Sequence, residues 1–313
     1  ESATWKETTT FIPTKKNDYL SALSVSIKLY CKRNDHDCVV LGAGRSNTFF
    51  ALMQALIPKG KIKPCIMIDC LWYKSPNKFC SFLKNTIMRL ADRSVDRYVV
   101  WARREIEAYS REFGLPRNKF VYIPYHTTLD AYHLSSIDNG YLFSGGNFSR
   151  DYKTLIESVR GLPIKLLIAC TRPELFKKMD IPTNVTVQGF SHGEYLTKMA
   201  GCRINIVALA PGHLHSGGQQ TFLNSMYLGK PTIVTDPEGA CDYIENGRNG
   251  LLVEPGDVGA LRNAIMFLLD NPLKASEMGR EAREKVQGLS TEDHFQKVVA
   301  LALEILSKKG ISI

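Results

Sequence analysis

The residues whose types and spacing most plainly allow chemistry lie in the loop Ser216-Gly-Gly-Gln-Gln-Thr221, which leads into a short apolar stretch ending at Gly229-Lys-Pro231. Ser216 predicts a helix N-cap, because a serine hydroxyl accepts a hydrogen bond from a free backbone N–H of the first turn. Gly217 and Gly218 let the backbone come close to a ligand. The start of a helix attracts anions. The loop therefore predicts a phosphate site at Ser216–Thr221, with an ordinary glycine loop as the alternative.

A carboxylate is the second candidate. Asp69 ends the apolar run 64–69, which predicts a buried strand. A side chain at the carboxyl end of a strand in an open α/β sheet faces the crevice where ligands bind. Asp69 is accordingly our candidate general base, and capping of the following turn is its alternative role.

Further candidate ligand-binding residues in the first half of the chain have weaker support from the sequence. Gly42-Ala-Gly44 follows an expected strand but lacks the third glycine of a dinucleotide fingerprint. Arg45 comes next and either faces a ligand or is solvated. The polar segment 125–140 predicts a linker, whose His126 either lines a cleft between domains or is exposed.

The elements that must position these residues alternate between strand and helix. Apolar runs predict strands, in chain order, over 8–13, 38–42, 64–69, 96–101, 119–124, 141–146, 164–169, 184–188, 204–209 and 232–236. Helical periodicity covers 18–33, 48–56, 74–90, 103–113, 154–160, 258–270, 274–287 and 293–308. This pattern predicts an α/β protein with two Rossmann-like, doubly wound sheets facing a central cleft.

We expect three parts along the chain: a basic first domain over 1–135, a second domain over 136–290, and a terminal helix over 291–313 that crosses back. The charge is uneven, with 21 Lys and Arg against 12 Asp and Glu through Ser135 and 19 against 19 after it. The first part should therefore meet something anionic. In the helix expected at 74–90, apolar and basic residues are interleaved, so it either binds an anionic membrane surface or buries one face in its own domain.

The eight cysteines are scattered and include no Cys-x-x-Cys pair. This usage favours reduced thiols in a cytosolic protein over a disulfide frame or a zinc site. No apolar run approaches the roughly 20 residues that span a bilayer, and the first residues do not form a secretion signal. We expect a cytoplasmic protein, with peripheral binding at the inner face of a membrane as an option.

The run Leu228-Gly-Lys-Pro-Thr-Ile-Val-Thr235, followed by Gly239-Ala-Cys-Asp-Tyr-Ile-Glu-Asn-Gly-Arg-Asn-Gly-Leu-Leu-Val-Glu-Pro-Gly-Asp257, resembles the carboxyl-terminal domain of family 4 glycosyltransferases. The resemblance covers about 141–290, and the stretch 114–124 is similar to the end of the family's first domain. It implies a GT-B fold in which the acceptor-binding domain covers 1–135 and the nucleotide-sugar-binding domain covers 136–290. The donor would be a nucleoside diphosphate sugar such as a UDP-sugar, with no obligatory metal and no cofactor.

The resemblance also implies a set of donor-side residues: Gly146, Asn147, Arg150, Lys153, Thr171, Gly189, Phe190, the loop Ser216, Gly217, Gly218, Gln219, Gln220 and Thr221, then Asn224 and Asp242. The acceptor side would hold Gly44, Arg45, Trp72 and His126. Where the family usually has Gly-Arg, this chain has Gly146-Asn147, so Arg150 and Lys153 would bind the diphosphate instead.

The chain departs from the family at its two characteristic glutamates, whose positions fall on Ser216 and Asn224. Asn224 could still hydrogen-bond a ribose hydroxyl, whereas Ser216 carries no charge. Asp242 stands where the family usually has glutamate, and Asp69 where relatives often have histidine. An aspartate base fits an inverting displacement better than a retaining one.

These features together favour a hexosyltransferase acting in cell-surface glycan or glycolipid synthesis. Lipid-linked glycan or anionic membrane, acidic polysaccharide and duplex DNA are the acceptor options. The basic residues do not form a stripe of phosphate contacts, which disfavours nucleic acid. A DNA-modifying glucosyltransferase, a non-catalytic sugar-nucleotide-binding scaffold and a GT-B-fold epimerase are the alternatives.

Overall fold

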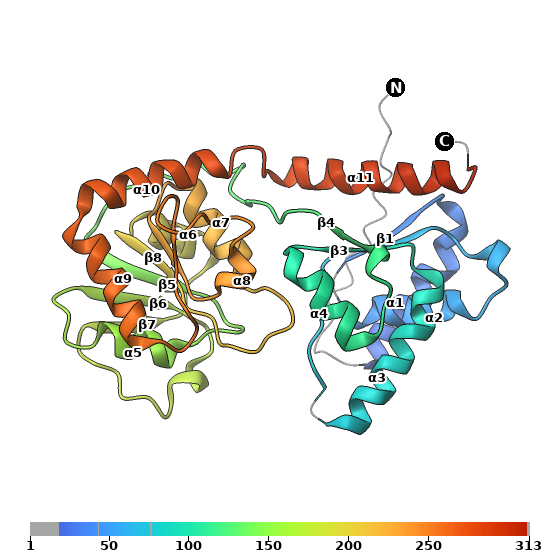
Figure 1. The fold of residues 1–313 in the computed structure, drawn as a ribbon, viewed down its shortest axis with the longest axis horizontal. Helices are drawn as coiled ribbons and strands as arrows, with labels where there is room; N and C mark the ends of the chain where they lie inside the picture. Colours follow the sequence, from blue (N-terminus) through green and yellow to red (C-terminus); the bar gives the residue numbers. More distant parts are fainter. Residues whose placement is uncertain (1–18, 43, 76, 312–313) are drawn as a thin grey trace.

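The structure is a computed structural model that describes residues 19–42, 44–75 and 77–311. It contains two parallel β-sheets, each covered by helices, which lie side by side as two domains (Figure 1). The expected α/β fold with two parallel, helix-covered sheets is confirmed. The strand predicted at 8–13 lies outside the described residues.

The first sheet has the order β1-β2-β3-β4, with all neighbours parallel. Its strands are β1 (Val39–Leu41), β2 (Cys65–Met67), β3 (Arg97–Val100) and β4 (Phe120–Tyr122). Four helices belong to this domain: α1 (Tyr19–Lys32), α2 (Arg45–Ala55), α3 (Lys78–Ala91) and α4 (Arg103–Phe113). The strands are apolar because helices cover both faces of the sheet.

The second sheet has six parallel strands in the order β10-β9-β8-β5-β6-β7. They are β5 (Tyr141–Gly145), β6 (Lys165–Ala169), β7 (Val185–Gln188), β8 (Ile204–Val207), β9 (Thr232–Val234) and β10 (Leu251–Leu252). Its helices are α5 (Tyr152–Val159), α6 (His192–Ala200), α7 (Gln219–Tyr227), α8 (Pro237–Ala240), α9 (Val258–Asp270) and α10 (Pro272–Lys285). The strand order reverses between β5 and β8, and ligands of open α/β sheets bind at such a point.

Helix α11 (Thr291–Lys308) runs back from the second domain and lies along the first sheet, on the side opposite α1–α4 (Figure 1). Its Val298, Leu301 and Ile305 pack in one cluster with Ile66 and Val99 of the strands. The backbone N–H of Thr127 in the linker donates to the carbonyl of Leu289 at 2.8 Å. The chain therefore passes between the domains twice, and the two crossings are hydrogen-bonded to each other.

Five short 3₁₀ helices complete the described elements: η1 (Arg33–Asp35), η2 (Lys59–Lys61), η3 (Asp92–Ser94), η4 (Arg117–Lys119) and η5 (Pro173–Phe176). The eight cysteines are free thiols. Among the described helices, none combines the length and apolar character needed to span a membrane.

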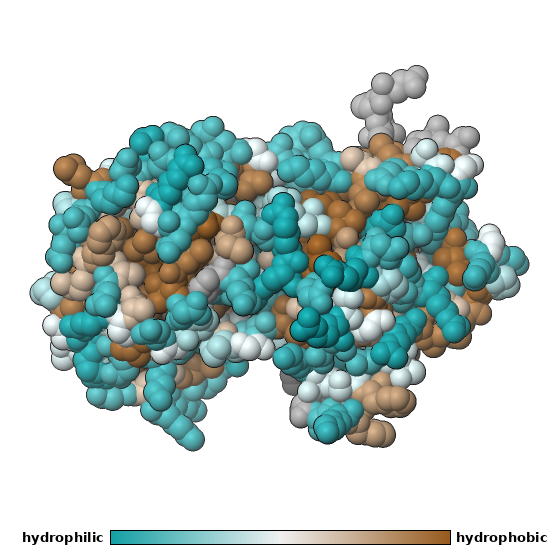
Figure 2. Space-filling view, viewed as in Figure 1, coloured by the Kyte–Doolittle hydropathy of each residue, from teal (hydrophilic) through white to brown (hydrophobic). Residues whose placement is uncertain are grey.

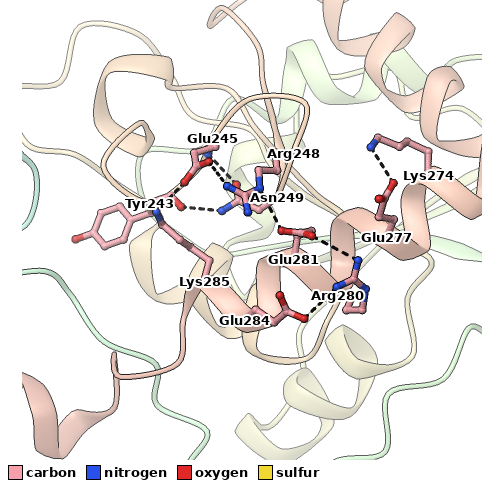
Figure 3. A network of polar contacts seen from close by, with 10 residues as sticks. All are labelled: Tyr243, Glu245, Arg248, Asn249, Lys274, Glu277, Arg280, Glu281, Glu284 and Lys285. Carbon is pink, nitrogen blue, oxygen red and sulfur yellow. Dashed lines mark hydrogen bonds and ion pairs between the residues drawn. The ribbon is translucent and has the colours of Figure 1, made fainter.

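A network of ion pairs links α10 to the turn that follows α8 (Figure 3). Glu245 pairs with Lys285 and Arg248 at 2.9 Å each, and Arg248 reaches Glu281 at 3.1 Å. Inside the turn, Asn249 accepts from the Glu245 N–H at 2.8 Å. The network fixes the segment that carries Asp242 and Tyr243, both of which reach the other domain.

Among the helix starts that differ from the predictions, two have a cause that the structure shows. Helix α7 begins at Gln219, and its N-cap is Gly218 in the left-handed conformation (φ 78°), so the predicted cap at Ser216 is wrong. A Cβ at Gly218 would lie 2.6 Å from Val207, which makes glycine necessary there. Helix α3 begins at Lys78 instead of residue 74, because the side chain of Asn77 accepts from the Cys80 N–H and caps it.

Candidate functional site

A cavity of about 670 Å³ lies between the two domains, at the carboxyl ends of both sheets. The first domain contributes Leu71, Tyr73 and Trp101, which follow β2 and β3, and the linker contributes Tyr125. The second domain contributes the loops after β5, β6 and β7 and the start of α7. Its size is typical of a small-molecule site.

The charge of this cavity is unusual. Among the described residues that line it there is one arginine, Arg150, with no lysine, aspartate or glutamate. A lone guanidinium without a carboxylate in the same wall favours an anionic ligand.

Arg150 joins the two loops that meet at the switch point of the second sheet. Its Nε donates to the Gly145 carbonyl at 2.9 Å, and its Nη2 donates to Thr221 Oγ1 at 3.1 Å. A Cβ at Gly146 would lie 2.6 Å from Nη2, so only glycine leaves room for the guanidinium. The loop after β5 and the first turn of α7 are thereby held around one positive charge.

The first turn of α7 also faces the cavity. Its first backbone N–H groups have no acceptor within the helix, and Gly217 through Thr221 all line the cavity. The positive end of the helix and Arg150 therefore lie on the same wall. Together they suit a phosphate group.

Other residues of the cavity wall carry rings or small side chains. They include Thr171, Phe190, His192 and Tyr195. Asn147 orders Thr171, because its Oδ1 accepts from the Thr171 N–H at 2.9 Å and from the Thr171 hydroxyl at 3.2 Å. Gly189 packs against Thr171 behind the wall without lining the cavity.

Asn224 lines the cavity but is already engaged by the linker. Its Oδ1 accepts from the Thr128 N–H at 2.9 Å, and its Nδ2 donates to Thr128 Oγ1 at 2.9 Å. Only 3% of the residue is exposed. The amide therefore anchors the linker to α7, whatever else it binds.

The start of α4 holds the second domain through several polar contacts. Arg104 donates from Nε to Ser216 Oγ at 3.1 Å and from Nη2 to Asp236 Oδ2 at 3.0 Å. Tyr243 donates to the Trp101 carbonyl at 2.5 Å and accepts from the Tyr125 N–H at 2.8 Å. These contacts, with those of Glu105 and Asp242 below, are called the α4 contact.

Glu105 is the buried acid of the α4 contact. Its Oε2 accepts from the N–H groups of Trp101 and Ala102, at 2.9 and 3.1 Å, and its Oε1 accepts from the Ser216 N–H at 2.6 Å. Burial raises the pKa of Glu105 to about 7, while the three N–H donors and Arg104 act in the opposite direction.

Asp242 lies in the α4 contact and does not line the cavity, where the resemblance had implied a donor contact. Its Oδ2 accepts from the Arg103 N–H at 2.7 Å, and its Oδ1 pairs with the Arg103 guanidinium at 2.6 Å. Asp242 thus caps the helix of the other domain, and a carboxylate at a helix N-terminus is favourable there.

Asp69 lies beside the cavity without lining it. Its φ of 56° is rare for a residue other than glycine, and it precedes Leu71 and Tyr73, which do line the cavity. Burial raises the pKa of its carboxyl to about 6. Such a carboxylate is mostly deprotonated at neutral pH and more basic than an exposed one.

Several residues named from the sequence lie away from the cavity. Lys153 is exposed on α5. Trp72 packs in an aromatic cluster with Tyr98 and Phe113, each at 5.3 Å between ring centroids. His126 stacks on Tyr125 at 4.6 Å, also between ring centroids.

The remaining two also have local roles. Gly44 is the N-cap of α2, with a φ of 138°, and Arg45 lies 4.4 Å above the ring of Tyr19. The structure therefore does not bring Gly44, Arg45, Trp72, His126 or Lys153 to the cavity wall.

These aromatic and histidine side chains of the wall were missed in the sequence analysis: Tyr73, Trp101, Tyr125, Phe148, His192, Tyr195 and His215. Trp101 and Tyr125 each follow an expected strand, a position that points toward the crevice, so they could have been found. His192 and Tyr195 lie on α6, a helix for which no prediction was made. No group of three or more His, Cys, Asp or Glu that could hold a metal ion occurs within residues 19–42, 44–75 and 77–311.

Comparisons with known proteins concern the second domain and the fold. Residues 142–285 match the family model described as glycosyl transferases group 1. The chain is 34% identical over 97 residues to D-rhamnosyltransferase WbpZ of Pseudomonas aeruginosa, which is 30% of this chain and 25% of that protein. The chain covers about a quarter of the length of the curated relatives it matches.

Two solved structures share the fold across both domains. Sucrose-phosphate synthase from Thermosynechococcus elongatus has a TM-score of 0.74 and 19% identity, with 96% of this chain and 81% of that chain covered. Anabaena Alr3699/HepE in complex with UDP-glucose has a TM-score of 0.72 and 18% identity, with 91% and 84% covered. The expected GT-B fold is thereby confirmed.

Proposed function

We propose that this chain, whose residues 142–285 belong to the glycosyl transferases group 1, moves a hexose from a nucleoside diphosphate sugar to a hydroxyl group of a glycan or lipid-linked acceptor. The observation that carries the proposal is the position of Arg150, which joins the loop after β5 to the first turn of α7 in a cavity wall that has no described carboxylate. HepE, which shares the fold, was solved in complex with UDP-glucose.

In this proposal the diphosphate lies against Arg150 and the N–H groups of Gly217 through Thr221. A guanidinium and a helix N-terminus stabilise the negative charge that grows on the departing diphosphate, which is the main electrostatic task of this reaction. Because these groups supply the positive charge, the proposed chemistry needs no cofactor. The nucleoside diphosphate sugar is a substrate. The nucleotide base would lie against Thr171 and Phe190, which also line the cavity.

Asp69 is the proposed base for the acceptor hydroxyl. Its raised pKa of about 6 leaves it deprotonated at neutral pH, yet more able to accept a proton than an exposed aspartate. The side chains of Leu71 and Tyr73, which follow it, reach the cavity. Catalytic hydrogen bonds often form only when the substrate is bound. Asp69 would therefore accept a hydrogen bond from the acceptor hydroxyl only once the acceptor is bound.

The acceptor is proposed to be presented at an anionic membrane. Phe79 and Phe82 on α3 are 76% and 71% exposed, and Lys74 and Lys78 beside them are exposed as well. Figure 2 shows apolar side chains projecting at the foot of the first domain next to hydrophilic ones. An exposed apolar group with lysines around it suits an anionic lipid surface, which favours a lipid-linked acceptor over nucleic acid.

A non-catalytic scaffold that binds sugar nucleotides is the second candidate. The observation behind it is that Ser216 and Asn224 occupy the glutamate positions implied by the family, and the α4 contact and the linker already engage both. A donor-hydrolysis assay distinguishes the glycosyltransferase from the non-catalytic scaffold. An enzyme releases nucleoside diphosphate slowly but in excess over its own concentration, whereas a scaffold releases none.

The direct test is a thermal unfolding series with UDP-, GDP-, TDP- and ADP-sugars. Ligands that bind the folded state alone raise its apparent stability. We expect one nucleotide to raise the melting temperature, and Arg150→Ala to abolish the rise. No rise with any of the four would overturn the donor site.

A further inference from the structure

The end of the first domain that lies opposite the central cavity carries a group of positive charges. The cavity is at the carboxyl ends of the strands, so the turns that precede the strands lie at the other edge of the sheet. Helix η2 precedes β2 and η3 precedes β3, and these two strands are parallel neighbours. The cations of the two turns, which we call the basic edge, are Lys59, Lys61, Lys63 and Arg93. The exposed acids Asp35 and Asp37 precede β1 and bound the basic edge on that side.

Buried polar side chains fix both turns to helix α2. Gln54, which is 0% exposed, accepts from the Lys63 N–H at 3.0 Å and donates to the Lys63 carbonyl at 3.4 Å. Ser94, which ends η3, donates to the carbonyl of Ala51 on the same helix at 2.7 Å. The basic edge is therefore ordered before any partner arrives, which lowers the cost of binding.

The positive charge of the basic edge is not neutralised. Among the described residues, none of its four members forms an ion pair with a carboxylate. The acids beside it are already engaged: Asp92 pairs with Lys119 at 3.0 Å, and Asp96 pairs with Lys309 at 2.8 Å. The sequence has no aspartate or glutamate over 38–68. Such a surface attracts anions.

The residue types of the basic edge suit a flexible polyanion. Three of its members are lysines at alternate positions in the chain, and a lysine ammonium binds an anion as a point charge without a fixed geometry. Repeated acidic groups of a polymer can thus be bound in several registers. Residues 59–64 and 92–96 contain no aromatic side chain on which the bases of a single-stranded nucleic acid could stack.

A lipid surface fits the basic edge less well. The exposed Phe79 and Phe82 lie near the start of α3, whereas Arg93 follows its end. A helix of 14 residues is about 21 Å long, so α3 separates these apolar side chains from the basic edge. Leu56, which is 75% exposed at the end of α2, is an apolar side chain closer to the lysines, and a variant can test it.

We propose that the basic edge binds an anionic polysaccharide, through acidic groups that recur along the glycan chain, at a site remote from the cavity. That the polymer is a glycan rests on the proposed function, whereas the charges by themselves select a polyanion. A polymer held at the basic edge would raise the effective concentration of its own hydroxyl groups at the cavity.

The test compares polygalacturonate with dextran, an uncharged polysaccharide, by calorimetry. We expect the original chain to bind polygalacturonate and not dextran, and this binding to weaken at high salt. The triple variant Lys59→Glu, Lys61→Glu and Lys63→Glu should weaken polygalacturonate binding at least about tenfold, because it reverses the local potential.

A second triple variant controls for net charge. Lys177→Glu, Lys178→Glu and Lys198→Glu change exposed lysines of the second domain and alter the net charge by the same amount. This variant should keep polygalacturonate affinity within about twofold of the original chain. Equal losses in the two triple variants would show an effect of net charge alone and overturn the proposal. Melting curves establish that both variants are folded.

The other partners are outcomes of the same design. Leu56→Ser should leave polygalacturonate binding unchanged. If the first triple variant keeps its affinity for polygalacturonate but loses binding to vesicles with an anionic phospholipid, the basic edge is a lipid site. Tighter binding of duplex DNA than of polygalacturonate would assign it to nucleic acid. Either result, or equal binding of dextran and polygalacturonate, overturns the proposal.

None of these measurements contains a nucleotide, so the proposal and the proposed function fail separately. Binding of polygalacturonate at the basic edge by a chain that binds no sugar nucleotide would overturn the function in glycan synthesis and leave a polyanion site. Binding of a sugar nucleotide by a chain that does not bind polygalacturonate would overturn the basic edge alone.

Discussion

Glu105 in α4 accepts a hydrogen bond of 2.6 Å from the backbone N–H of Ser216, so an acid of the first domain holds the loop that begins the proposed diphosphate site. The family resemblance implies a carboxylate at Ser216 itself. Here a carboxylate lies next to that position, but it comes from the other domain and does not line the cavity. The shape of the loop therefore depends on how the two domains sit together.

The raised pKa of Glu105 predicts a pH-dependent stability. The pKa of Glu105 is about 7 in the folded state and 4.5 in the unfolded chain, so the folded state holds the proton more tightly. Stability contributed by Glu105 is therefore highest below pH 4.5 and declines as pH rises to 7. The loss is on the order of 3 kcal/mol at most.

The measurement is urea unfolding of the original chain and of Glu105→Gln at pH 5 and pH 8. The free energy of unfolding of the original chain, relative to that of the variant, should be lower at pH 8 than at pH 5. Glu107→Gln, on the exposed side of the same helix, is the control and should show no such change. A constant difference between the original chain and Glu105→Gln would contradict the prediction.

Arg150→Ala should weaken nucleoside diphosphate binding between tenfold and a hundredfold, because hydrogen bonds to charged groups contribute about 1.5–3 kcal/mol. Arg150→Lys should recover part of the affinity, since lysine keeps the charge without the two-pronged geometry. Lys153→Ala, three residues on but outside the cavity, is the matched control. Calorimetry with the best nucleotide checks all three, and unchanged affinity in Arg150→Ala would rule out the diphosphate site.

Asp69→Asn should leave donor binding intact and abolish transfer to the acceptor. In the original chain the rate should fall as pH drops below about 6, because the base is then protonated. Measuring kcat/KM from pH 5 to pH 8 checks the profile. Full activity in Asp69→Asn would remove it as the base, and a flat profile would speak against a carboxylate in that role.

The double change Phe79→Ser and Phe82→Ser should reduce binding to vesicles that contain an anionic phospholipid by at least tenfold, since each buried phenylalanine contributes about 1.5–3 kcal/mol. Binding of the original chain should also weaken at high salt. Leu273→Ser, which removes an apolar side chain that is 87% exposed on α10, should have no effect. Co-sedimentation measures all of these, and equal binding to uncharged vesicles would contradict the anionic preference.

Much of the fold could be predicted because its signals are local. Alternating apolar runs and helical periods indicated the two sheets, and α4 was predicted with its observed bounds, since Gly114 ends it in the left-handed conformation (φ 65°). The start of α7 could not be predicted, because the N–H of Ser216 is bound by Glu105, a residue far away in the sequence.

The same limit applies to the candidate site. Asn147, Arg150 and Thr171 follow strands and line the cavity, and position after a strand is readable from sequence. Asp242 was assigned to the donor from the family resemblance, and its bond to Arg103, 139 residues away, has no signal in the local sequence. Trp72 follows a strand too, yet its ring turns into an aromatic cluster, and no local pattern distinguishes that orientation from one toward the cleft.

Helix α11 also has a consequence for how the protein is made. Ile66, Val99 and Ile123 of the first sheet are covered by side chains of α11 as far along the chain as Ile305. A ribosome adding about 5–20 residues per second needs on the order of 10–40 seconds to go from Ile123 to Ile305. During that interval one face of the first sheet lacks its cover, so the nascent chain should be a client for chaperones until α11 emerges.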